Sequence, residues 1–316
     1  MPALRLLRRA LPDEGFVLHG PAWVADVPGF PVVPAPPDVS GGTRLTSSVS
    51  RAPRSPAPPA TSGVSDGPSL TSDVRTAPIT LVNLHGRGPQ SHARLDALVP
   101  DDGSARRIGH AAPGWDGPPW TDDPTRPERR RWCDLLAACG LVTADEAAAA
   151  ADDLRLPGPT PPAVGNGAVV IHPGAAFGSK RWPVERFAAV ARALGARGHE
   201  VVVTGGPDEA GLTTQVPGRD LAGRTSVGEL CRLVAHARLV IAGDTGIAHV
   251  ATAYGTPSVT LFGPVGPEQW GPPADPRHVT LTDASVRRGE RFADEPDPAL
   301  LAVGIDDVLD AAVTVL

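Results

Sequence analysis

Lys180 is the only lysine in a chain that has 29 lysine and arginine residues, and its neighbours suit a phosphate-binding turn. The run His172-Pro-Gly-Ala-Ala-Phe-Gly-Ser-Lys180 is predicted to join a strand to a helix. A glycine-bearing turn of this kind frees backbone N–H groups and points a helix dipole at an anion, and an ammonium group adds a mobile charge. We therefore expect Lys180 beside the phosphates of a nucleotide. An ordinary surface lysine is the alternative that this residue alone leaves open.

Further polar residues follow other predicted strands of the same region. They are Glu209, Asp244, Thr245, Gly246 and His249. Thr245 and Gly246 open a predicted helix, so their N–H groups can bond a diphosphate, while the carboxylates of Glu209 and Asp244 suit sugar hydroxyls. A diphosphate between two polyols describes a nucleotide sugar. Helix capping is the structural alternative for each of these residues taken singly, and hydrogen-bonded packing is the alternative for His172 and His249.

The elements that position these residues alternate regularly. Strands are predicted at 168–171, 200–204, 220–222, 238–242 and 257–262, and helices at 183–194, from 208, at 226–236 and at 247–254. Strands separated by single helices imply parallel crossovers and hence a doubly wound α/β sheet. In such a sheet ligands bind outside the carboxyl ends of the strands, so all of these polar residues are expected at one edge.

Composition divides the chain into segments. Residues 1–155 are assigned to an N-terminal domain that contains a disordered insertion at 38–78, a tract of Ser, Pro, Thr, Gly, Ala and Val without aromatic residues. The Pro/Gly-rich stretch 156–167 is assigned to a linker, and 168–297 to a C-terminal domain. Residues 298–316 are expected to form a helix that packs back on the N-terminal domain.

Several runs resemble glycosyltransferase family 9, the ADP-heptose:lipopolysaccharide heptosyltransferase family. They are HPGAAFGSKRWPVERFAAVARAL, VVVTGGPDE, ARLVIAGDTGIAHVATAYGTPSVTLFGP and the later Trp270-Gly-Pro-Pro. The resemblance implies a GT-B fold, in which two Rossmann-like domains face a cleft. It also implies transfer of a heptose-like sugar from a nucleotide-diphosphate donor to an acceptor hydroxyl with inversion, in lipopolysaccharide or other cell-envelope glycan biosynthesis, without a cofactor or a metal.

The resemblance also implies roles for single residues. Lys180 would contact the donor diphosphate and Glu209 would hold the ribose of the nucleoside. Asp244, Thr245 and Gly246 would hold the donor sugar and phosphates, with His249 supporting their loop. Ala175 and Ala176 stand where some heptosyltransferases have threonines, which is a departure that bears on the identity of the donor.

The N-terminus departs from the family pattern. The sequence begins directly with a predicted amphipathic helix, Pro2 to Leu11, so the first strand of a Rossmann-like domain is missing. In the family that strand leads to a Gly-Asp loop whose aspartate is the general base, and no residue here occupies that position. Either the start is misassigned by about twenty residues, the span of a strand and turn, or the protein binds without catalysing. We favour the first explanation, because loss of a central strand would expose its neighbours.

The predicted strand at 79–84 is followed by a polar, glycine-rich loop. His85, Arg87 and Gln90 are our candidates for binding an acceptor, which is a glycan, a lipid or a small molecule. A tight turn with solvated neighbours is the structural alternative. The same loop nearly spells the dinucleotide-binding fingerprint but has Ser91 in place of its third glycine, so an NAD-dependent oxidoreductase is a further alternative.

Composition restricts the partners. A net charge of −6 and no basic surplus argue against nucleic acid. The longest apolar runs are short of a membrane span, so we expect at most peripheral membrane association. The three cysteines have no metal-ligand spacing, and an odd count without a secretion signal favours the cytoplasm.

Overall fold

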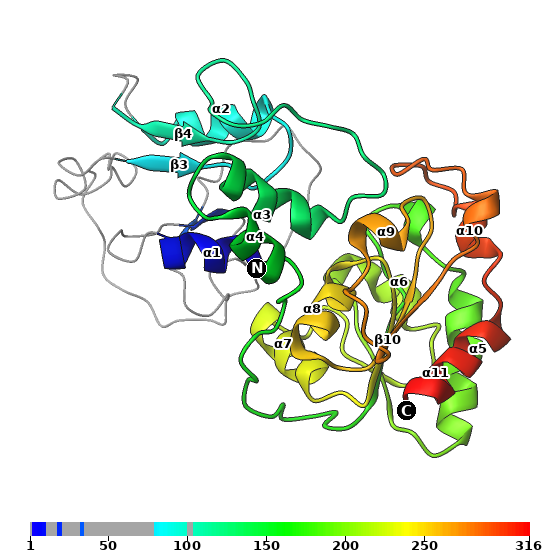
Figure 1. The fold of residues 1–316 in the computed structure, drawn as a ribbon. Coiled ribbons are helices and arrows are strands. Elements are labelled where there is room, and N and C mark those ends of the chain that lie inside the picture. The colour runs from blue at the N-terminus through cyan, green and yellow to red at the C-terminus, as the bar shows by residue number, and fades with distance from the viewer. Residues whose placement is uncertain (1, 11–17, 21–31, 35–78, 100–103) are drawn as a thin grey trace, which may run out of the picture.

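The computed structural model of the chain describes residues 2–10, 18–20, 32–34, 79–99 and 104–316 (Figure 1). The insertion predicted at 38–78 lies outside the described residues. Figure 1 shows the N-terminal half, in blue to green, beside a larger C-terminal half, in green to red, and residues 151–167 run between them.

The C-terminal half is built on one sheet of six parallel strands. These are β5 (Val169–His172), β6 (Val201–Val203), β7 (Arg219–Asp220), β8 (Leu239–Gly243), β9 (Ser258–Leu261) and β10 (His278–Leu281). Their order is β10-β9-β8-β5-β6-β7, and every pair is parallel. The predicted doubly wound sheet is thereby confirmed, with a topological switch point between β5 and β8, where the strand order reverses. The edge strand β10, a run of only four residues, was not predicted from the sequence.

Helices cover both faces of this sheet. α5 (Val184–Ala196) and α11 (Ile305–Val315) lie on one face, and α7 (Val227–Ala235) and α8 (Gly246–Tyr254) lie on the other. α5 buries Phe187, Val190 and Leu194 against the sheet, as the helical spacing of its apolar residues predicts. The strands β6, β8 and β9 are buried along their whole length between the two helical layers, which is typical of a parallel sheet.

Within the part of the chain that the structure describes, the C-terminal segment packs on the sheet of the C-terminal half, whereas the expectation from the sequence was packing on the N-terminal domain. It forms α10 (Pro298–Leu301) and, after a break, α11. α11 buries Val308, Ala311 and Ala312 in the cluster that α5 and the sheet share. Its apolar stripe therefore completes the cover of the sheet next to α5 (Figure 1).

The described residues of the N-terminal half form two parallel strand pairs. β1 (Leu18–Gly20) pairs with β2 (Val32–Pro34), and β3 (Thr80–Val82) pairs with β4 (Arg106–Ile108). The helices of this half are α1 (Pro2–Ala10), α2 (Gln90–Asp96), α3 (Glu128–Ala138) and α4 (Ala144–Ala150). The prediction of a helix at the start of the sequence is confirmed by α1, whose buried Ala3, Leu6 and Leu7 pack with α3 and α4.

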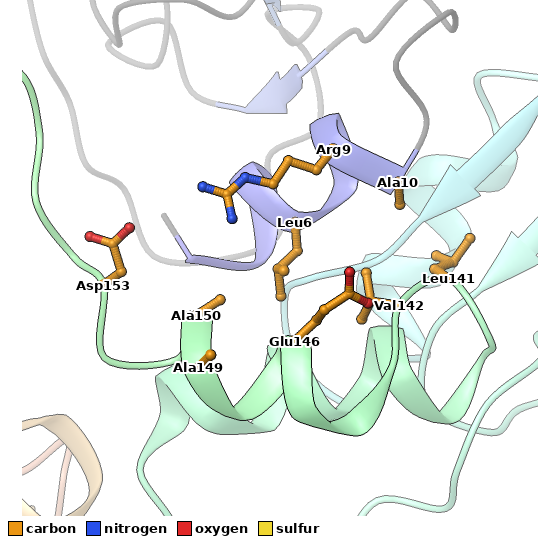
Figure 2. Close-up of a pocket in the computed structure, with 9 residues that line it drawn as sticks. All are labelled: Leu6, Arg9, Ala10, Leu141, Val142, Glu146, Ala149, Ala150 and Asp153. Carbon is orange, nitrogen blue, oxygen red and sulfur yellow. The ribbon is translucent and has the colours of Figure 1, made fainter.

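A pocket of about 250 Å³ lies where α1 meets α4 (Figure 2). Figure 2 shows Leu6 pointing from α1 toward α4, with the charged side chains of Arg9 and Asp153 at the edge of the pocket. Most of the remaining lining is apolar, so this pocket belongs to the packing of α1 rather than to the polar loops of the C-terminal sheet.

His92 is a buried histidine beside β4. Its ring stacks on Trp115, with 4.3 Å between the ring centroids, and His92 is only 3% exposed. Among the described residues neither ring nitrogen has a hydrogen-bond partner. Burial lowers the pKa of His92, while nearby Asp96 opposes the shift. The imidazole is therefore neutral in the folded protein at neutral pH.

We expect the free energy of unfolding of His92→Phe to fall less steeply in acid than that of the unsubstituted protein. The unfolded chain keeps a histidine pKa near 6.5 and takes up a proton first, so stability is lost as the pH falls below about 6.5 toward the lower pKa of folded His92. Urea unfolding at several pH values measures this slope. At pH 7 the substitution should change the free energy of unfolding by less than about 1 kcal/mol, since relief of two unpaired polar atoms offsets a tighter fit. An unchanged slope would contradict this account of His92.

Candidate functional site

The loop after β5 crosses the carboxyl ends of two neighbouring strands. A Cβ atom on Gly243, the last residue of β8, would lie 3.0 Å from the carbonyl oxygen of Lys180. A Cβ atom on Gly263, just beyond β9, would lie 3.0 Å from the carbonyl oxygen of Ser179. Glycine at both positions lets the loop lie directly on the sheet edge, and this carries Lys180 from β5 to the loop after β8.

Lys180 forms an ion pair with Asp244, the first residue after β8. The Nζ of Lys180 donates to Oδ2 of Asp244 at 2.7 Å, and the exposed fractions of the two side chains are 24% and 6%. A carboxylate buried to this extent needs a cation, because an unpaired buried charge is costly. Since β5 and β8 flank the switch point, the pair lies where a doubly wound sheet binds its ligand.

The start of α8 adjoins this ion pair. Thr245 is the N-cap residue and makes no capping hydrogen bond with its side chain. Gly246, the first residue of the helix, is exposed, and a Cβ atom there would meet no atom within 4 Å. The N–H groups of a helix's first turn have no acceptor within the helix and carry its positive dipole end. One turn into α8, Nε2 of His249 lies 3.8 Å from Oδ1 of Asp244.

Glu209 lies against the loop after β5 from the neighbouring strand. Its Oε2 accepts from the backbone N–H of Gly206 at 2.7 Å, and a Cβ atom on Gly174 would collide with its carboxylate. His172 is close by, with Nε2 3.9 Å from Oε2 of Glu209 and Nδ1 3.1 Å from Oγ1 of Thr204. Burial lowers the pKa of His172 despite the opposing charge of Glu209, so the imidazole is neutral and serves as a packing and hydrogen-bonding group.

A segment at 287–297 holds the Lys180 loop in place. Ser179 is fully buried; its N–H donates to the carbonyl of Ala293 and its hydroxyl to the carbonyl of Arg291, both at 2.8 Å. A Cβ atom on Gly178 would collide with the carbonyl of Asp294. The segment is itself fixed by buried Asp297, which accepts hydrogen bonds from two backbone N–H groups of 289 and 299 at 3.0 Å. Sequence reasoning missed this segment, because its role is carried by backbone contacts.

The expectation that the Lys180 turn supplies free backbone donors was wrong for residues 179–181. The N–H of Ser179 is used as described above, the N–H of Lys180 donates to the carbonyl of Phe177, and the N–H of Arg181 donates to the carbonyl of Gly178. α5 begins only at Val184, so its dipole end does not adjoin Lys180. The turn closes as a 3₁₀ helix, which uses its own N–H groups. The helix start suited to an anion is that of α8.

The three acceptor-side candidates lie on the loop after β3 and at the start of α2. His85, Arg87 and Gln90 are all exposed. Arg87 faces Asp122, with 3.7 Å between Nη1 and Oδ2. Within the described residues no hydrogen bond or ion pair joins the three to Lys180 or Asp244. The structure thus brings together the C-terminal candidates and places these three on a separate loop.

A pocket of about 350 Å³ lies between the two halves of the chain. Its lining residues are Trp120, Asp122, Asp123, Pro124, Glu128 and Arg131 from one half and Gln269, Trp270 and Arg291 from the other. The ring centroid of Trp270 is 6.2 Å from that of His249, so the pocket borders the Lys180–Asp244 site. Of these residues only Trp270 belonged to a motif recognised in the sequence. The others could not be connected by sequence, because they come from distant segments that meet only in the folded chain.

Among the described residues, no three His, Cys, Asp or Glu side chains are grouped so that they could hold a metal ion. No helix in the described ranges has both the length and the apolarity needed to cross a membrane.

The chain is similar in sequence to known heptosyltransferases. The family model "Glycosyltransferase family 9 (heptosyltransferase)" matches residues 130–290, half of the chain. Lipopolysaccharide heptosyltransferase 3 of Escherichia coli is 41% identical over 118 residues, covering 34% of this chain and 35% of that protein. Lipopolysaccharide heptosyltransferase 2 of Escherichia coli K12 is 36% identical over 107 residues, covering 30% and 31%. The chain thus matches about a third of the length of these curated relatives.

Solved structures extend the similarity of fold beyond that segment. The ADP-heptose lps heptosyltransferase II of Escherichia coli superposes with a TM-score of 0.64 at 16% identity, covering 99% of this chain and 93% of that one. A glycosyl transferase family 9 structure from Veillonella parvula DSM 2008 has a TM-score of 0.55 at 20% identity, covering 77% and 75%. The GT-B fold expected from the sequence is confirmed, and the chain belongs to glycosyltransferase family 9.

Proposed function

We propose that this protein is a glycosyltransferase that moves a heptose-like sugar from a nucleoside diphosphate donor to an acceptor hydroxyl with inversion. The observation that carries the proposal is the Lys180–Asp244 ion pair at the switch point, beside the start of α8. Relatives named as lipopolysaccharide heptosyltransferases support a donor like ADP-heptose and a place in lipopolysaccharide or cell-envelope glycan biosynthesis.

The donor contacts follow from the chemistry of each group. Lys180 and the N–H groups of Thr245 and Gly246 would neutralise the charge that develops on the departing diphosphate. Lys180 would then turn from Asp244 toward the phosphates, and the carboxylate of Asp244 would accept from hydroxyls of the donor sugar. His249 would support this loop from α8. The Glu209 carboxylate would accept hydrogen bonds from the ribose.

The acceptor would be a glycan, a lipid or a small molecule held from the N-terminal half. We propose His85, Arg87 and Gln90 as its binding residues; the proximity of Arg87 to Asp122, which lines the pocket between the halves, supports this placement. Inversion also requires a base that takes the acceptor proton, and we assign that role to none of the described residues.

Domain limits and location complete the proposal. We propose an N-terminal domain at 1–155, a linker at 156–167 and a donor-binding domain from 168, to which the tail 298–316 belongs by its packing. A cytoplasmic location is supported by Cys133, Cys139 and Cys231, which are thiols rather than disulfides, as in reducing compartments.

Calorimetric titration of the full chain with ADP, GDP, UDP and NAD tests the donor class, and release of ADP from ADP-heptose tests turnover. We expect a nucleoside diphosphate to bind and NAD not to bind. Binding of NAD alone would favour the oxidoreductase alternative, for which family membership provides no support. Tight ADP binding without any turnover would favour a nucleotide-sugar binder that does not catalyse.

Lys180→Ala should weaken ADP binding by about 1–3 kcal/mol, a rise in Kd of about 5- to 150-fold, because a charge-assisted hydrogen bond is lost. The same change should lower the free energy of unfolding by about 1–3 kcal/mol, since Asp244 would remain buried without its cation.

Calorimetry and urea unfolding separate these two effects. A Lys180→Ala/Asp244→Asn double variant should be more stable than Lys180→Ala, because no unpaired carboxylate remains. Its ADP affinity should stay low, because the cation is still absent. An unchanged Kd in Lys180→Ala would remove Lys180 from the donor site.

Glu209→Gln should reduce the preference that we expect for ADP over 2′-deoxy-ADP and 3′-deoxy-ADP. The substitution keeps the shape of the side chain and weakens its hydrogen bonds to ribose hydroxyls, costing about 1 kcal/mol in ADP affinity. A double cycle of variant and deoxynucleotide isolates this contact. Glu229→Gln is the matched control: Glu229 makes the same bond to a backbone N–H, at Ser226, at the start of α7. Equal discrimination in both variants would refute the role of Glu209.

A further inference from the structure

Glycine backbone covers both edges of the His92 ring. A Cβ atom on Gly88, in the loop between β3 and α2, would lie 2.5 Å from Nδ1 of His92, and a Cβ atom on Gly109, just after β4, would lie 2.9 Å from Nε2. Trp115 covers one face of the ring by stacking on it. Both ring nitrogens are therefore enclosed by backbone, and water does not reach them.

This enclosure suits only a neutral imidazole. A protonated ring has two N–H donors, and each of them needs an acceptor or a water molecule. In the part of the chain that the structure describes, no acceptor reaches either nitrogen, and a buried charge without partners is costly. His92 can therefore take up a proton only if one of its covers moves aside and admits water.

Asp96 is the charged group that acts on His92 from the same helix. Burial lowers the pKa of His92, and Asp96 opposes this shift without cancelling it. Burial also acts to raise the pKa of Asp96, but its hydrogen bonds lower that pKa overall: Nε of Arg107 donates to Oδ1 at 2.7 Å, and Nε1 of Trp115 donates to Oδ2 at 3.2 Å. Asp96 thus stays ionised in weak acid, and its oxygens are bonded to groups other than His92.

The remaining charged or titratable side chains on the elements around His92 are exposed, apart from His110. The exposed ones are His85, Arg87, Arg94, Arg106 and Asp116. Water screens an exposed charge, so these groups act weakly on a buried ring. Buried His110 follows Gly109; its Nδ1 donates to the carbonyl of Pro118 at 3.2 Å, and burial lowers its pKa. Two buried histidines in this region can thus respond to acid, and variants of both are needed to tell them apart.

The loop that carries Gly88 is held at its ends but not in its middle. Asn83 ties the two ends, since its Oδ1 accepts from the N–H of His85 and its Nδ2 donates to Oγ of Ser91, both at 2.9 Å. Between these ends, residues 86–88 make no backbone–backbone hydrogen bond with any described residue. The middle of the loop can therefore move while its ends stay fixed.

The other two covers of His92 are anchored more firmly. The N–H of Gly109 donates to the carbonyl of Asp116 at 3.0 Å, and Trp115, which is 5% exposed, donates from its indole to Asp96. Moving either cover would break these buried contacts. Moving residues 86–88 would break only the exposed ion pair of Arg87 with Asp122, which contributes little to stability. Displacement of the loop is thus the easiest way to let water reach His92.

We propose that the loop at 85–89 is an acid-operated gate: protonation of His92 displaces Gly88 and lets the loop swing away from the ring, while α2, β4 and Trp115 keep their places. The gate goes beyond the proposed function and does not depend on it. Its consequence for the reaction does, because the loop carries His85 and Arg87, which we assign to acceptor binding. Acid would withdraw these two side chains from the acceptor.

Limited proteolysis with trypsin measures the opening of the loop in the full chain. Trypsin must draw the residues on both sides of the Arg87–Gly88 bond into its cleft, and Gly88 lies on the His92 ring in the closed loop, so cleavage follows the open population. The measured quantity is the rate at which fragments beginning at Gly88 appear, divided by the cleavage rate of a free peptide of residues 83–92 at the same pH. Opening linked to one proton with a pKa of about 6.5 should raise this ratio about five- to tenfold between pH 7.5 and 5.5.

Substitutions at three positions identify the group that operates the gate. His92→Phe cannot be protonated, so its cleavage ratio should not change with pH, and His92→Leu makes the same test with a smaller side chain. His110→Phe is the matched control, because it removes the other buried histidine, and it should keep the full rise in acid. Gly88→Ala should be cleaved faster already at pH 7.5, because its Cβ would meet His92 and the φ of +82° disfavours a side chain.

A cleavage ratio that does not rise in acid, or that rises equally in both His92 variants, would overturn the proposal. So would a rise that only His110→Phe removes. Far-UV circular dichroism at pH 5.5 should match that at pH 7.5, since a loss of helix signal would mean unfolding of the protein instead of opening of the loop and would also defeat the gate. ADP titration of the same samples tests the donor assignment separately, so either proposal can fail without the other.

Discussion

The C-terminal half is organised around the ion pair between Lys180 and Asp244. Asp244 follows β8 directly and its side chain is 6% exposed, so its charge must be met inside the protein. The cation comes from the loop after β5, on the other side of the switch point. A buried carboxylate and a single lysine thus fix two loops to each other, and the start of α8 follows in the next two residues. An anion that draws Lys180 away would leave Asp244 available for hydroxyl donors, so the same pair can serve two parts of one ligand.

Close backbone contacts make this pairing possible. Gly243 and Gly263 let the Lys180 loop lie on the strand ends, and Gly178 lets the 287–297 segment cover it. Buried Ser179 is bonded on both its backbone and its hydroxyl to that segment. A loop held in this way loses little further conformational entropy when a ligand binds. The rigidity of the binding loop therefore derives from a segment more than a hundred residues later in the chain.

Sequence alone predicted the C-terminal half well, because its signals are local. Apolar runs and helical spacing gave the strands and helices from β5 to β9, and parallel crossovers placed Lys180, Glu209 and Asp244 at one edge. Where the structure differs from what the sequence predicted, a group finds its partner in a segment that is distant along the chain. The N–H groups of 179–181 are used by a 3₁₀ helix and a distant segment, and the tail packs beside α5 because of its own apolar stripe. The pocket between the halves depends on residues such as Trp120 and Arg291 that no short motif connects.

The positive charge of the proposed donor site is concentrated on one side of the sheet edge. Lys180 and the positive end of α8 lie there together and favour a diphosphate. In the pocket between the halves, by contrast, charged groups face one another: Arg131 donates to Glu128 and Arg87 faces Asp122. An anion would therefore gain more at the start of α8 than in the pocket, so charge as well as shape would orient the proposed donor.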